Sequence, residues 1–122
     1  MPEVEARFVG WIRRITEARL NLLGLERLAD GLLLIVSEIV TNAVEYAGHD
    51  GPGSVTVTQR LAGGRLRIEV TDTGHGLPKA KAPSTTEENG RGLHLVDSLT
   101  AELGGQWGFD PGQRTTWIDL PT

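Results

Sequence analysis

The sequence predicts an α+β protein, a two-layer sandwich in which helices pack on one face of a mixed, mostly antiparallel sheet. Apolar residues recur with the helical period in three segments, at residues 3–23, 25–47 and 90–103. Alternating segments are expected to form two hairpins across glycine-containing turns, 55–58 with 66–70 and 107–109 with 115–120. Helices interspersed with adjacent hairpins are typical of a sheet covered by helices on one side.

Length and composition restrict the class of protein. A chain of 122 residues with 39% hydrophobic residues is expected to form one domain, residues 1–122. The net charge of −4 argues against direct contact with nucleic acid, whose binders usually carry a basic face. The absence of cysteine fits a cytoplasmic location. No apolar run approaches the roughly 20 residues needed to cross a bilayer, so no membrane partner is expected.

The first expected helix, residues 3–23, combines apolar positions at helical spacing with several arginines, and Gly24 is a suitable stop. The arginines are Arg7, Arg13, Arg14 and Arg19. A solvated basic face is the preferred interpretation of these arginines, and a partner-binding face is the alternative.

The second expected helix, residues 25–47, carries a polar pair beside its apolar face. Glu38 and Asn42 are four residues apart, so they lie one above the other on the same side of the helix. An amide oxygen suits a hard cation such as Mg²⁺, and a carboxylate can accept a proton from a nucleophile. Taken alone, the pair is more simply the wet edge of an amphipathic helix.

A second unusual position ends the strand after the Gly63–Gly64 turn. Asp72 shares the parity of Leu66, Ile68 and Val70, so its carboxylate is expected on the buried face, where it needs a partner. Residues 73–89 then form a long polar loop, either a binding lid or a surface excursion. Gly90 to Gly92 are expected to open the third helix and to expose N–H groups that suit an anion.

Together these features resemble the GHKL superfamily of ATPases and kinases, whose domain has the Bergerat ATP-binding fold. Residues 38–44, EIVTNAV, resemble its N-box; residues 72–76, DTGHG, its first glycine box; and residues 90–96, GRGLHLV, its second. Three boxes in order over nearly the whole chain make the resemblance specific. It is greatest to short actinobacterial anti-sigma factor serine/threonine kinases, and smaller to histidine kinases, because no phosphoacceptor helix precedes the boxes in this sequence.

The resemblance implies a role for each matching residue. Glu38 would be the catalytic base, Asn42 would hold Mg²⁺, and Asp72 would accept the exocyclic amine of adenine. The remaining ATP contacts would come from Gly74 and Gly76 near the base, and from Gly90, Arg91, Gly92 and Leu93 at the phosphates. The adenine-site threonine is either Thr115, favoured by the family motif, or Thr116, favoured by strand parity.

The resemblance therefore implies an ATP- and Mg²⁺-dependent kinase that phosphorylates a serine or threonine of an anti-anti-sigma (STAS-type) partner and binds a sigma factor. The arginines of the first helix are a candidate sigma-binding face. The alternative is a nucleotide-gated binding module without kinase turnover, and a third interpretation is a domain that binds no nucleotide. The family's usual first strand is missing here, so a homodimer through a sheet edge is left open.

Overall fold

The structure is a computed structural model and describes residues 3–47, 54–72 and 87–122. Its elements follow the predicted order, with helices and hairpins alternating along the chain. They are α1 (Glu3–Leu22), the 3₁₀ helix η1 (Glu26–Leu28), α2 (Ala29–Ala47), β1 (Val55–Ala62), β2 (Arg65–Asp72), α3 (Glu87–Glu102), β3 (Gln106–Asp110) and β4 (Thr115–Pro121).

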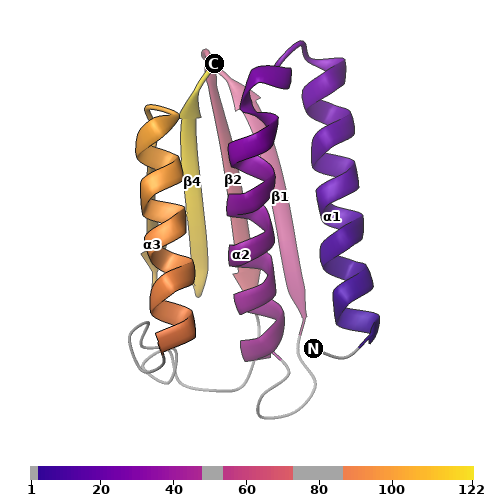
Figure 1. The fold of residues 1–122 in the computed structure, drawn as a ribbon, viewed down its shortest axis with the longest axis vertical. Helices are drawn as coiled ribbons and strands as arrows, with labels where there is room; N and C mark the ends of the chain where they lie inside the picture. Colours follow the sequence, from indigo (N-terminus) through magenta and orange to yellow (C-terminus); the bar gives the residue numbers. More distant parts are fainter. Residues whose placement is uncertain (1–2, 48–53, 73–86) are drawn as a thin grey trace.

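The described strands form one sheet in the order β1-β2-β4-β3, and every neighbouring pair is antiparallel. Figure 1 shows α1, α2 and α3 side by side on one face of this sheet, with α2 between the other two. The predicted α+β two-layer sandwich is therefore confirmed. The sheet was expected to be mixed and mostly antiparallel. All of its described strands are antiparallel to their neighbours.

Glycine conformations explain the sharp reversals of the chain. Gly63 and Gly64 have φ of 61° and 74°, which matches the hairpin turn that joins strands through two left-handed residues. Gly104, at φ 76°, ends α3 with Gly105 N–H donating to the Thr100 carbonyl at 3.0 Å. This is the backbone pattern of a Schellman stop, and it confirms the predicted end of the third helix.

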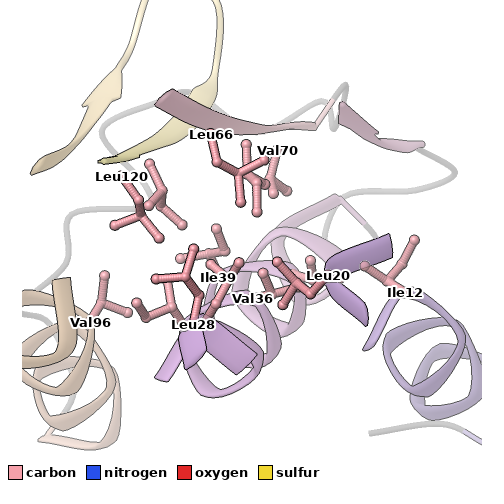
Figure 2. Packing of buried hydrophobic residues seen from close by; sticks show 14 of the residues in the cluster. Ile12, Leu20, Leu28, Val36, Ile39, Leu66, Val70, Val96 and Leu120 are labelled. Carbon is pink, nitrogen blue, oxygen red and sulfur yellow. The ribbon is translucent and has the colours of Figure 1, made fainter. Parts of the chain in front are cut away.

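The core lies between α2 and the sheet, as Figure 2 shows for side chains from all three helices and two central strands. Leu32, Ile35, Val36 and Val40 on α2 are fully enclosed. They pack with Ile68 and Ile118 of the sheet and with Val96 of α3, all at most 1% exposed. Burying one such side chain contributes about 1.5–3 kcal/mol, so α2 is the element on which the fold depends most.

Two helix boundaries differ from the prediction. Residues 26–28 are a 3₁₀ turn, so α2 begins at Ala29 rather than near Leu25. The third helix begins at Glu87, three residues before Gly90, so residues 87–89 are helical rather than part of the loop. Its glycines therefore lie inside the first turns of α3 and do not precede it. Within the described residues, no helix has both the length and the apolar content required to cross a membrane.

Candidate nucleotide-binding site

Four chain segments that carry the predicted site residues meet at one end of the molecule. Figure 1 shows the last turns of α2, the end of β2, the first turns of α3 and the start of β4 at the same end. Because α2 and α3 lie on the same face of the sheet, side chains that point inward from all four segments approach one region.

Glu38 on α2 faces Gly92 on α3. A Cβ built on Gly92 would lie 2.6 Å from Oε2 of Glu38, so the carboxylate fills the space that a side chain would need. Both Glu38 and Asn42 are half-buried, and they stand one turn apart on α2. The structure therefore brings the first and third sequence boxes together at the α2–α3 contact.

The second glycine box lies in the first turns of α3. Gly90 and Arg91 belong to its first five residues, and Gly92 and Leu93 to the following turn. The first four N–H groups of an α-helix have no partner within the helix, and this range covers Gly90 but not Leu93. The predicted phosphate contacts of these residues stay predictions, and the helix start at Glu87 makes Gly90 the most suitable donor among them.

Asp72 is buried on the helix-covered face, as its parity predicts, and is 5% exposed. Its carboxylate has a partner that the sequence did not reveal: Nε of Arg114 donates to Oδ1 at 3.0 Å. The backbone N–H of Asp72 also donates to the Arg114 carbonyl at 3.2 Å. Burial of Asp72 is therefore explained within the chain, and it does not by itself require an adenine.

Arg114 occupies this position in a left-handed conformation, with φ of 52°, the only such non-glycine residue in the described segments. L-residues adopt this conformation at a cost of about 1–2 kcal/mol. The turn from β3 to β4 thus holds a strained residue whose side chain is 16% exposed and contacts a candidate binding residue. Such strain is often found at functional sites.

The two candidate threonines lie on opposite faces of the sheet. Thr116 pairs with Val70 and has the parity of Ile118 and Leu120, so it shares the helix-covered face with Asp72. Thr115 lies on the other face, where its Oγ1 is 2.7 Å from Oγ1 of Thr71. Thr116 is therefore the candidate that shares a face with Asp72, and the choice between the two threonines stays a prediction.

Gly74 and Gly76 lie outside the described residues, as do the side chain of Arg91 and the expected lid. Within the described parts, no group of three His, Asp or Glu side chains could hold a metal ion. Glu38 and Asn42 do supply hard oxygen donors one turn apart. This donor set fits Mg²⁺ that takes most of its ligands from phosphates and water.

Comparison with known proteins agrees with this arrangement. Residues 28–122 match the family described as histidine kinase-, DNA gyrase B-, and HSP90-like ATPase. The chain belongs to this ATPase family. The match includes every element from the last residue of η1 to β4, and with them every predicted site residue. Family membership confirms the resemblance to the GHKL superfamily and implies ATP binding.

Relatives with curated names come from several branches of this ATPase family. The chain is 35% identical over 96 residues to the sensor histidine kinase PdtaS of Mycobacterium tuberculosis, covering 75% of this chain and 19% of that protein. It is 34% identical over 91 residues to the DNA mismatch repair protein MutL of Acidiphilium cryptum, covering 75% and 14%. The chain thus spans less than a fifth of the length of either relative.

Solved structures give the same fold. The histidine kinase domain of the Erythrobacter litoralis EL346 blue-light activated kinase has a TM-score of 0.63 at 30% identity, covering 77% of this chain and 44% of that one. The catalytic domain of histidine kinase ThkA has a TM-score of 0.62 at 19% identity, covering 76% and 66%. At that identity the second likeness supports the fold alone.

Proposed function

We propose that this ATPase-family domain is an anti-sigma regulatory kinase. It binds ATP with Mg²⁺ and transfers the γ-phosphoryl group to a serine or threonine of a STAS-type anti-anti-sigma protein. The contact between the Glu38 carboxylate and Gly92 is the observation that carries the proposal. It holds a candidate base against the second turn of α3, next to the helix start where the phosphates are expected to bind.

The transfer requires one proton acceptor near the γ-phosphate. The hydroxyl oxygen of the partner forms a bond to the γ-phosphorus, and the bond from that phosphorus to the β–γ bridging oxygen breaks. ADP leaves, and Glu38 accepts the hydroxyl proton. Asn42 would hold Mg²⁺ with its side-chain oxygen, and the ion would supply positive charge to stabilise the phosphates.

Adenine recognition is assigned to the covered face at the end of β2. A carboxylate has about four acceptor positions, so an adenine amine and Nε of Arg114 can both donate to Asp72. Thr116 lies on the same face in β4, two residues after Arg114 of the β3–β4 turn. Gly74 and Gly76 would let the backbone approach the base.

The kinase proposal is tested by transfer from radiolabelled ATP to purified STAS-type candidates from the host, followed by phosphoamino-acid analysis. We expect acid-stable phosphoserine or phosphothreonine on the partner. Glu38→Gln should lower the transfer rate at least about 100-fold while ATP affinity stays within about twofold, because a general base contributes about 10²–10⁴-fold. The absence of transfer to any candidate, with ATP binding intact, would contradict the proposal, as would acid-labile phosphohistidine.

The second candidate is a nucleotide-gated binding module without kinase turnover. The ion pair between Asp72 and Arg114 favours it, because a base bound at Asp72 shares the carboxylate that holds Arg114, which links nucleotide binding to the β3–β4 turn. If the protein is a module of this kind, the Glu38→Gln variant still captures its partner, and the capture still depends on ATP. The same variant therefore distinguishes the two functions.

A sigma factor is the second proposed partner. A pull-down from the host with ATP, ADP or no nucleotide tests it. Capture of a sigma factor that changes with the nucleotide supports the anti-sigma role, and capture of none in all three states contradicts it.

A further inference from the structure

Helix α1 has two apolar faces, although a surface helix normally has one. Its inner face consists of Val9, Ile12, Thr16 and Leu20, all at most 9% exposed against the rest of the fold. On the other side, Trp11 is 53% exposed, Ile15 36% and Leu22 86%. These large side chains are not part of the core, and their exposure requires a separate explanation.

The outward residues follow the spacing of a coiled-coil seam. Steps of three and four residues alternate along the helix through Phe8, which is half-buried and packs against the core, and through the exposed Trp11, Ile15, Ala18 and Leu22. We call these five residues the outer stripe. In heptad terms, positions 8, 15 and 22 are a, and positions 11 and 18 are d. The rings of Phe8 and Trp11 are 6.4 Å apart, so the first turn of the stripe already forms a cluster. The geometry is that of a surface for one further helix.

The charges beside the stripe are basic. Arg14 occupies a g position and Arg19 an e position, and both are exposed. Helix α1 contains four arginines and three glutamates, so it is weakly basic, whereas the whole chain has a net charge of −4. Residues at e and g set the choice of partner in helix pairing, so this surface is complementary to an acidic helix.

A second copy of this chain is a poor partner for the outer stripe, because its α1 carries the same basic residues. In a parallel pair, Arg14 of one copy would oppose Arg19 of the other, and in an antiparallel pair arginines would oppose arginines. A membrane surface fits less well because the stripe is narrow, although its arginines suit anionic lipid, so vesicle binding is one outcome of the test.

We propose that the outer stripe of α1 is the docking surface for an amphipathic helix of a partner protein, with acidic residues beside its apolar seam. Helix α1 lies on the far side of α2 from α3, as Figure 1 shows, and therefore away from the Glu38–Gly92 contact. The proposal concerns a second site and does not depend on kinase activity.

The test uses two synthetic helical peptides of three heptads with leucine at a and d, one with glutamate and one with lysine at e and g. Fluorescence anisotropy of labelled peptides measures binding to the intact protein. We expect the acidic peptide to bind at least tenfold more tightly than the basic one. Trp11→Gln with Ile15→Gln should weaken the acidic peptide at least tenfold, and Arg14→Glu with Arg19→Glu should reverse the preference.

Unchanged circular dichroism and ATP binding show that the variants are folded, which is expected because all four residues are exposed. Leu34→Gln on α2 is the matched control: it removes a side chain that is 46% exposed outside the stripe, and peptide binding should not change. Equal binding of the two peptides would overturn the proposal. Self-association, or binding to anionic vesicles, that is lost in the Trp11→Gln, Ile15→Gln variant would overturn it in favour of another occupant.

Discussion

Arg114 donates from Nε to Oδ1 of Asp72 at 3.0 Å, and so joins the start of β4 to the end of β2 beneath the helices. The two side chains are 16% and 5% exposed, which makes this the most buried ion pair given by the described residues. It connects the residue proposed to recognise adenine with the strained residue of the β3–β4 turn. Four of the predictions below involve this region of the sheet.

Arg114→Ala should lower the free energy of unfolding by about 2–3 kcal/mol, because it removes the charged partner of a buried carboxylate. Arg65→Ala is the matched control. Arg65 pairs with Asp119 at the surface, with side chains 48% and 22% exposed, so its loss should cost less than about 1 kcal/mol. Urea unfolding measures the loss of unfolding free energy in both variants. Equal losses would show that the Arg114–Asp72 pair contributes little.

Arg114→Gly should be more stable than Arg114→Ala by about 1 kcal/mol. Both variants lack the ion pair, but glycine adopts the φ of 52° without steric cost, whereas alanine does not. The order should reverse at Arg60, an exposed residue inside β1, where glycine costs about 0.5–1 kcal/mol relative to alanine. The same urea experiment measures all four variants. The same order at both positions would mean that Arg114 is not strained.

Gly92→Ala should separate stability from activity. Alanine is intrinsically favoured over glycine in a helix by about 1 kcal/mol. Its Cβ, however, would lie 2.6 Å from Oε2 of Glu38, so the carboxylate would have to move. We expect phosphoryl transfer to fall at least about tenfold, with melting temperature and ATP affinity nearly unchanged. Gly10→Ala is the control, because its Cβ would meet only Arg14 at an ordinary 3.5 Å. It should raise stability by up to about 1 kcal/mol and leave transfer intact.

Asp72→Asn should weaken ATP and ADP to a similar extent, by at least about tenfold, because both carry the adenine amine that the carboxylate is proposed to accept. The variant also removes the charge that faces Arg114, so some stability is lost with it. Arg114→Ala loses the same ion pair but keeps the carboxylate, and it should retain more affinity. Calorimetric titration compares them, and an equal loss of affinity would assign the effect to the fold.

Thr116→Val should weaken ATP several-fold with little change in stability, since Thr116 shares the covered face with Asp72. Thr115→Val should instead lower the free energy of unfolding and leave ATP affinity unchanged. Its hydroxyl lies 2.7 Å from that of Thr71 on the other face, and its removal should cost about 1 kcal/mol without affecting ATP. A loss of ATP affinity confined to Thr115→Val would restore the assignment based on the family motif.

Local sequence signals explain which parts of the fold were predictable. The Gly63–Gly64 turn and the end of the third helix at about residue 103 were predictable because the chain needs positive φ at Gly63, Gly64 and Gly104, which glycine supplies without steric cost. The start of α3 was misplaced because Glu87 to Asn89 are polar and resemble a loop, while the glycines after them resemble a helix entry.

The positions of the site residues were predictable only where the pattern within a single helix or strand determines them. Strand parity placed Asp72 on the covered face, and helical spacing placed Glu38 above Asn42. The Arg114–Asp72 pair joins residues 42 positions apart, and the Glu38–Gly92 contact depends on how α2 and α3 pack. Neither follows from a local pattern, because both depend on sheet register and helix packing.

The connectivity of the sheet has a consequence for how the protein folds. Each hairpin closes over a few residues, but every pair in the ladder between β2 and β4 is at least 44 residues apart, the separation of Thr71 and Thr115. Closing so long a loop loses more chain entropy than closing a tight turn, and non-local pairing slows folding. We therefore expect the hairpins to form early and the β2–β4 seam to set the refolding rate.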